Sequence, residues 1–455
     1  MRALAWPRLG GDTSSQPPVT LTEGRDLFTP QQLFGEVESS ADVLSHAPFL
    51  ERARDEHERA HELSARLALG AYLVSRLVDR MLVQDEAAGA QEGTLWQLDA
   101  VRRHLRELPA DAPESAHLHG ITDAIPVGTQ PLASLRLSLM AYAYFLEHEG
   151  RLEEAIEILE LAVRTHGPEV PAGDFAASAL FAGRLNRLLA RWTAATACYS
   201  AAESAATTAA DTVLTLRARL GRGAVLRGQG NLPLARRIAE EVAASASRAG
   251  HRAVEAMAYA DLGVVLMNEG RQIEAIQAIY QSFLLSDDLL QRTRALGDLG
   301  VALLGVGAVE AARTAFDIVL RSKSSFGVRL NAVLELMDIE SATGNRMAFE
   351  RRRAEGEASR LRMPPSMLAD FYYKSGVGLA RFGQTTRARD LLLAGQEHSE
   401  NYRLNAWYFR FEHTVANLSG CEIREPDPAL TEAREQPPAI REVAIGLRDF
   451  ALQAT

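Results

Sequence analysis

Two histidines, spaced as one helical turn would place them, are the sharpest candidate for chemistry in the sequence. Residues 57–61 read His57-Glu58-Arg59-Ala60-His61, within a stretch predicted to be helical. Two such histidines can bind zinc while the glutamate acts as a base toward the bound water. However, the surrounding sequence RARDEHERAHE is strongly charged, and no third ligand follows from any motif. The pattern therefore favours a solvated helix face, and a zinc hydrolase is the alternative.

Other catalytic signatures are absent from the sequence. There is no phosphate-binding G-x-x-x-x-G-K-[ST] and no G-x-S-x-G nucleophile turn. Cys198 and Cys421 are the only cysteines, too few for a disulfide framework or a cysteine zinc site. We therefore expect no catalytic residue, no metal and no cofactor.

The elements that must position any functional surface are clearest at residues 256–285. This stretch, AMAYADLGVVLMNEGRQIEAIQAIYQSFLL, predicts two antiparallel helices joined by a turn at Gly270. Apolar or small residues recur every three or four positions in both halves, which marks one face of a helix. Gly263 interrupts the first apolar face at a cost of about 1 kcal/mol relative to alanine. We therefore expect the partner helix, with its small Ala275, to approach closely there.

The same spacing of glycine, glycine and alanine recurs along the chain. Full copies are Gly223/Gly230/Ala235, Gly263/Gly270/Ala275, Gly300/Gly307/Ala312 and Gly376/Gly383/Ala388, with partial copies at Gly183/Ala190/Ala195, Ala143/Gly150/Ala155 and Gly344/Phe349. The turns step from 150 to 190, 230, 270, 307, 344 and 383. Seven hairpins at this period predict an all-α solenoid in which each repeat packs on its neighbours.

These hairpins resemble tetratricopeptide repeats (TPR) of the slightly long type found in signalling and scaffold proteins. GRLEEAIEILELAV at 150–163 and GRQIEAIQAIYQSF at 270–283 are similar to the turn and second helix of that family. The resemblance covers about residues 130–420 and implies that first helices line a concave groove. The Lys/Asn clamp with which chaperone-binding members grip a terminal carboxylate is not recognisable here.

The resemblance assigns a set of groove-facing residues to this sequence. They are Arg184, Arg187, Arg217, Arg227, Met257, Val264, Met267, Arg294, Val301, Asp338 and Tyr373. Such a groove is basic at one end, apolar in the middle and mixed to acidic at the other. It suits an extended or helical peptide with an acidic segment.

Composition and periodicity divide the chain into four expected regions. Residues 1–29, rich in proline, glycine and serine, predict a flexible tail. Residues 30–125 predict a helical N-terminal cap that contains one long helix from Pro48 to about Gln84. Residues 132–420 are the solenoid, with a Pro- and Gly-rich link at 165–174 as a candidate point of changing curvature. Residues 421–455 predict a loop and a C-terminal capping helix.

Charge and hydropathy exclude some classes of partner. The formal net charge of −10 argues against nucleic acid, whose recognition normally requires a basic surface. Residues 30–125 also lack a clear helix-turn-helix pattern. No segment reaches 18 uninterrupted apolar residues and no secretory signal is evident, so we expect no membrane insertion and a cytoplasmic location.

The sequence thus favours a non-catalytic scaffold or adaptor that binds another protein or a peptide through the concave groove. A regulatory sensor, in which a peptide or small ligand changes the curvature of the solenoid, is the alternative among binding proteins. The identity of the partner and the oligomeric state do not follow from the sequence.

Overall fold

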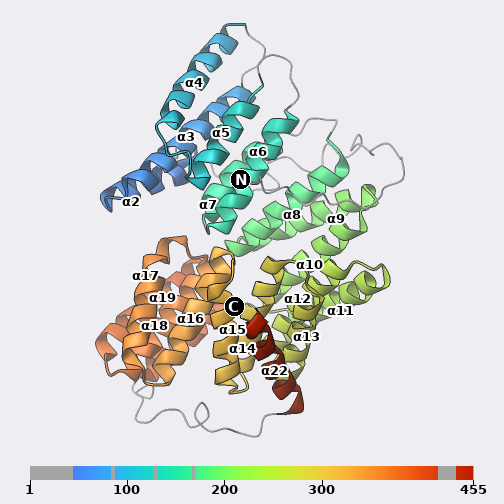
Figure 1. The fold of residues 1–455 in the computed structure, drawn as a ribbon, viewed down its shortest axis with the longest axis vertical. Helices are drawn as coiled ribbons and strands as arrows, with labels where there is room; N and C mark the ends of the chain where they lie inside the picture. Colours follow the sequence, from blue (N-terminus) through green and yellow to red (C-terminus); the bar gives the residue numbers. More distant parts are fainter. Residues whose placement is uncertain (1–44, 84–87, 127–131, 166–169, 419–436, 454–455) are drawn as a thin grey trace.

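The protein is seen in a computed structural model that describes residues 45–83, 88–126, 132–165, 170–418 and 437–453. Within these ranges every regular element is a helix, and the helices wind into one coiled array (Figure 1). Residues 1–29, the part of the 165–174 link at 166–169, the loop at 421–436 and Cys421 lie outside the described residues. No helix in the described ranges is long and apolar enough to cross a membrane.

Seven helical hairpins form the solenoid, which confirms the predicted fold class. Their first and second helices are α6 (Ala133–His148) and α7 (Leu152–Arg164), α8 (Ala172–Leu188) and α9 (Trp192–Thr208), α10 (Thr212–Gly228) and α11 (Leu232–Arg248), α12 (Arg252–Asn268) and α13 (Gln272–Leu285), α14 (Leu289–Leu304) and α15 (Val309–Arg321), α16 (Phe326–Ala342) and α17 (Arg346–Ala358), and α18 (Pro365–Arg381) and α19 (Thr385–Asn401). A further first-type helix, α20 (Asn405–Ala416), packs on α19.

Turn geometry and close helix packing confirm the glycine pattern. Six of the seven predicted turn positions are glycines with φ between +74° and +85°, and Ala190 takes φ +58° at the second turn. Glycine adopts this conformation without a Cβ penalty. Inside α12, a Cβ on Gly263 would lie 2.3 Å from Cγ1 of Ile279 and 3.2 Å from the carbonyl oxygen of Ala275. The absence of a side chain there is what lets α13 approach.

The predicted long helix from Pro48 to Gln84 is wrong, because the chain breaks it into two. α2 (Ala47–Glu58) ends before a turn in which Ala60 has φ +60°, and α3 (Glu62–Val83) then packs back on α2. Residues 57–63 are all exposed, so no core contact holds them in a continuous helix. The N-terminal region is completed by α4 (Ala88–Arg106) and α5 (Pro113–Ala124).

A buried polar network joins this N-terminal region to the first hairpin. Glu114 of α5 accepts hydrogen bonds from Arg52, Arg151 and the hydroxyl of Tyr142, each at 2.8 Å. Burial alone would raise the pKa of Glu114, but Arg151 and Arg52 hold that pKa below its ordinary value. The carboxylate is therefore charged and fully paired, and it fixes α5 against α6 and α7.

The last helix, α22 (Pro438–Gln453), packs along the side of the solenoid. Its apolar residues Ile440, Val443 and Leu447 are buried in the core cluster of hairpins four and five, in contact with α13 and α15. The ring of Phe450 meets that of Phe283 edge to face, with centroids 5.2 Å apart. The sequence predicted this helix as a terminal cap; its observed neighbours are second helices in the middle of the array.

The coil closes on itself between hairpins one and six. Figure 1 shows the α16–α19 block next to α7 and α8. Here the guanidinium of Arg362, which follows α17, donates to the carbonyl oxygen of Glu149 and lies 4.1 Å from the centroid of the Phe326 ring. That ring fills the space where a Cβ on Gly150 would lie, 2.3 Å away. We call this contact the closure contact.

Candidate functional site

The two histidines of the zinc-like motif do not form a preorganised pair. His57 belongs to α2, whereas His61 lies beyond the turn that separates α2 from α3. Nδ1 of His57 is 3.1 Å from Glu62, and Nδ1 of His61 is 2.9 Å from Glu56, with both histidine side chains more than half exposed. No group of three or more potential metal ligands occurs in the described residues. The continuous helix on which the zinc interpretation depended is therefore not there.

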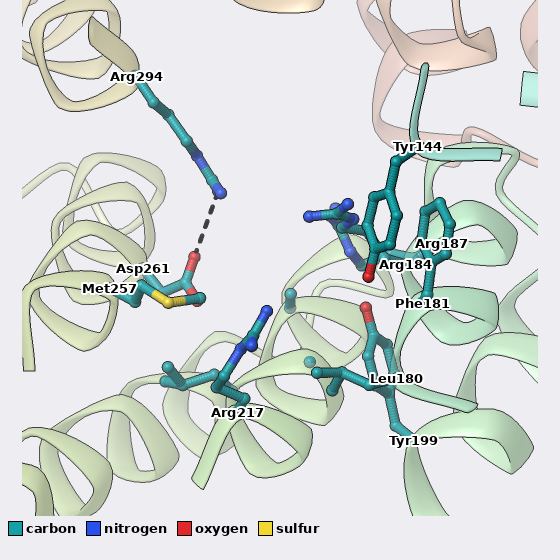
Figure 2. A pocket seen from close by; sticks show the side chains of 13 residues that line it. Tyr144, Leu180, Phe181, Arg184, Arg187, Tyr199, Arg217, Met257, Asp261 and Arg294 are labelled. Carbon is teal, nitrogen blue, oxygen red and sulfur yellow. Dashed lines mark ion pairs between the residues drawn. The ribbon is translucent and has the colours of Figure 1, made fainter. Parts of the chain in front are cut away.

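A cavity of about 90 Å³ instead opens among the first helices of hairpins one to five (Figure 2). We call it the arginine pocket. Its lining residues are Tyr144, Leu180, Phe181, Arg184, Arg187, Tyr199, Arg217, Leu220, Gly221, Ala224, Met257, Asp261 and Arg294. Nearly all of them come from α6, α8, α10, α12 and α14, so the hairpin topology itself gathers them on one surface.

Two of the pocket arginines are already paired with carboxylates. Arg184 forms an ion pair with Glu147, and its guanidinium lies 5.2 Å from the ring centroid of Phe181. Arg294 approaches Asp261 at 3.7 Å, the ion pair drawn in Figure 2. Asp261 raises the pKa of Arg294 against the effect of burial. These pairs leave part of the positive charge uncompensated.

The uncompensated charge belongs to Arg187, Arg217 and Arg227. Their Nε atoms are buried and have no hydrogen-bond partner among the described residues. Burial lowers the pKa of Arg217, and the nearby Arg184 lowers it further. Burial likewise lowers the pKa of Arg227, with repulsion from Arg187 and Arg294. A partly buried guanidinium remains charged, so each of these three side chains can still pair with an anion.

Carboxylates near these arginines reduce the excess charge without removing it. Asp298 lies close to Arg294 and Arg227, and burial raises the pKa of Asp298. Its Oδ2 has no hydrogen-bond partner in the described part of the chain. Asp211 also attracts Arg217, but its carboxylate caps α10 by accepting from the main-chain nitrogen of Leu214 at 2.9 Å.

An aromatic wall closes one side of the pocket. The rings of Tyr144 and Phe181 stack with centroids 4.0 Å apart and an interplanar angle of 3°. Tyr199 enters from the second helix α9, and Figure 2 shows its hydroxyl pointing toward that of Tyr144 near Arg184 and Arg187. The pocket therefore combines guanidinium and phenol donors with an apolar surface.

The structure brings together five of the residues that the sequence placed in the groove. Arg184, Arg187, Arg217, Met257 and Arg294 line the pocket, and Arg227 acts on it electrostatically from the end of α10. The remaining predicted residues lie elsewhere. Val264 is half-buried outside the pocket lining, Met267 and Val301 pack against the core of hairpins four and five, and Asp338 and Tyr373 belong to hairpins six and seven.

Hairpins six and seven carry a second charged group, which we call the lysine cluster. Nζ of Lys374 lies 2.7 Å from both Glu335 and Asp370. Burial alone would lower the pKa of Lys374, but the two carboxylates raise it above its ordinary value. Next to it, Asp338 pairs with Arg381 at 2.6 Å. Each charged group of this cluster lies at ion-pair distance from an opposite charge, with two cations shared among three carboxylates.

Sequence reasoning missed the aromatic residues of the pocket. Tyr144 and Phe181 were not assigned to the groove, and Tyr199 lies on a second helix, which the groove geometry excludes. The available signal is the pair Gly183 and Gly221 on the two flanking first helices. A Cβ on Gly183 would lie 2.9 Å from the ring of Tyr199, and one on Gly221 only 2.1 Å away.

Repeated hairpins with a cavity on their first helices define the class: the chain is a TPR-like α-solenoid. No family model and no curated protein matches the sequence.

Similar solved structures include three Rap-type proteins. A Rap protein complexed with competence and sporulation factor is 12% identical, with a TM-score of 0.44, over 79% of this chain and 98% of that one. The apo form of RapI is 9% identical, with a TM-score of 0.43, over 62% and 99%. The Rap conjugation gene regulator of plasmid pLS20 with the Phr* peptide is 12% identical, with a TM-score of 0.49, over 74% and 96%.

Proposed function

We propose that the protein is a non-catalytic binding protein that captures a peptide or protein segment in the groove of its first helices, with an acidic group of the partner held in the arginine pocket. The observation that carries this proposal is the group of three half-buried arginines, Arg187, Arg217 and Arg227, whose Nε atoms are buried and have no hydrogen-bond partner among the described residues. Leaving such donors unsatisfied costs folding free energy. An anionic ligand removes that cost and gains charge-assisted hydrogen bonds.

A peptide array tests the proposal directly. Peptides of about ten residues, matched in apolar content and carrying acidic, neutral or basic side chains, are probed with the purified chain. Acidic peptides are expected to bind wild type and to lose binding to the Arg217→Glu/Arg227→Glu variant. Arg237→Glu/Arg248→Glu is the matched control, since both arginines are exposed on α11 and the change in net charge is the same. Equal binding by the two variants would overturn the groove proposal.

A regulatory sensor is a second candidate, and the closure contact favours it. Arg362 and Glu149 lie in hairpins six and one, so a ligand that alters the curvature of the intervening repeats changes their separation. Fluorophores placed at exposed positions beside these residues are expected to report a change in distance when an array-selected peptide binds. An unchanged distance at saturation would leave simple capture as the function.

A further inference from the structure

The arginines around the arginine pocket offer more hydrogen-bond donors than one carboxylate of a ligand can accept. Arg187 and Arg217 line the cavity and Arg227 lies beside it, each with a buried Nε that lacks a partner in the described residues. A carboxylate is planar, carries one negative charge and pairs well with a single guanidinium fork. The neighbouring carboxylates Glu147 and Asp261 already serve Arg184 and Arg294. A single added carboxylate thus leaves guanidiniums unpaired.

Tyr199 adds a hydroxyl to the hydrogen-bond donors of the arginine pocket, although it does not lie on a first helix. It belongs to a second helix, α9, yet it lines a cavity formed by first helices. Its ring occupies the space that side chains would need on Gly183 of α8 and Gly221 of α10. The residue is only 3% exposed. Both helices therefore have a glycine where the ring of Tyr199 passes between them into the pocket.

From this arrangement we infer that the anionic group held in the arginine pocket is a phosphate monoester. A phosphate monoester carries between one and two negative charges near neutral pH and offers three acceptor oxygens. Guanidiniums from two neighbouring first helices and a phenol from behind them approach the cavity from different directions (Figure 2). Such a tetrahedral set of acceptors matches converging donors better than a planar carboxylate does. The inference rests on the proposed binding function and specifies the ligand of that same site.

The remaining walls indicate what the phosphate is attached to. Leu180, Leu220 and Met257 line the pocket together with the stacked pair Tyr144 and Phe181. These side chains offer apolar contact and ring stacking. The ligand class is therefore a phosphate ester of an aromatic or apolar alcohol.

Calorimetry with three simple probes tests the inference. Phenyl phosphate, phenylacetate and inorganic phosphate are titrated into the purified full chain at constant ionic strength and about pH 7.5, where the ester is mainly dianionic. Phenyl phosphate is expected to bind at least about tenfold more tightly than phenylacetate, because it engages more donors. It is also expected to bind more tightly than inorganic phosphate, because of the ring contacts.

Two variants and a control connect the binding to the pocket. Arg217→Gln is expected to abolish phenyl phosphate binding, and Tyr199→Phe, which removes only the hydroxyl, to weaken it about three- to tenfold. Arg237→Gln on the exposed face of α11 is expected to bind as wild type does. Circular dichroism and thermal melting of each variant separate loss of binding from loss of folding.

The outcomes separate this inference from the proposed function. If phenylacetate binds as tightly as phenyl phosphate, or if Tyr199→Phe and Arg217→Gln bind normally, the phosphate inference is wrong, and the peptide array alone decides the proposed function. If neither probe binds but the array shows Arg217-dependent acidic peptides, the phosphate inference alone fails. If the probes and the array are both negative, the proposed function fails with it.

Discussion

The arginine pocket and the lysine cluster both place charged side chains on first helices, but they differ in whether those charges have partners within the chain. In the lysine cluster, Lys374 lies between Glu335 and Asp370 at 2.7 Å from each. Arg217 in the arginine pocket and Arg227 beside it have buried Nε donors without hydrogen-bond partners in the described part of the chain. A buried charge whose partner is in the chain stabilises a fold, whereas a buried charge without one is suited to a ligand.

The largest expected effect is on stability, at the lysine cluster. Lys374→Met leaves the buried Glu335 and the half-buried Asp370 without their cation, which is expected to lower the free energy of unfolding by about 3–5 kcal/mol. Urea denaturation measures the change. Lys323→Met, at the only other lysine of the sequence and exposed in the structure, is the matched control and is expected to be neutral. A loss below about 1 kcal/mol would contradict the role of Lys374 as a structural charge.

A smaller loss is expected where Tyr199 passes between the first helices. Gly221→Ala places a Cβ 2.1 Å from Cε1 of Tyr199, and the overpacking is expected to cost about 1–3 kcal/mol. Phenyl phosphate binding is expected to weaken as well, because the ring is displaced. Gly173→Ala is the control, since no atom lies within 4 Å of its added Cβ. In a double-mutant cycle, Tyr199→Leu is expected to relieve the cost of Gly221→Ala; additive losses would show that the ring is not the obstacle.

At the unpaired arginines we expect almost no loss of stability. Arg227→Met removes a half-buried charge that forms no ion pair with the described residues, but it also removes an attraction to Asp261 and Asp298, so the free energy of unfolding is expected to change by less than about 1 kcal/mol. Affinity for acidic peptides is expected to fall in the same variant. Urea denaturation and the peptide array provide the two measurements. A destabilisation comparable to that of Lys374→Met would mean that the two regions do not differ.

The smallest effect concerns Cys198, which neighbours Tyr199 on α9. Burial raises the pKa of its thiol to about 12, so little thiolate exists near about pH 8 and labelling requires local opening. In a Cys421→Ser background, labelling by a disulfide reagent is expected to be slow and to slow a few-fold further with phenyl phosphate. Phenol, which lacks the charge, is the control. Rapid labelling of the free protein would show that α9 is not held in place.

The sequence predicted the repeats and part of the pocket because both follow from local rules. Left-handed turn positions need glycine at fixed spacing, and Gly270 illustrates this with φ +77°. Arg184, Arg187 and Arg217 lie on first helices, whose concave position follows from hairpin topology. Tyr199, in contrast, reaches the pocket only because two other helices carry glycine beside its ring, at Gly183 and Gly221. The break at Ala60 has no glycine to mark it, and the position of α22 on α13 and α15 depends on tertiary packing.

The closure contact changes how the array responds to force and heat. In a solenoid with two free ends each repeat contacts only its neighbours, so the array can bend along its length and unfold from its ends. Here the sixth hairpin is held to the first by the contact among Arg362, Phe326 and Glu149. This contact holds both ends of the segment from hairpin one to hairpin six. If one hairpin in the segment bends, the others must therefore adjust, or the contact must break. A ligand that changes the curvature of these hairpins must therefore also lengthen or break the closure contact.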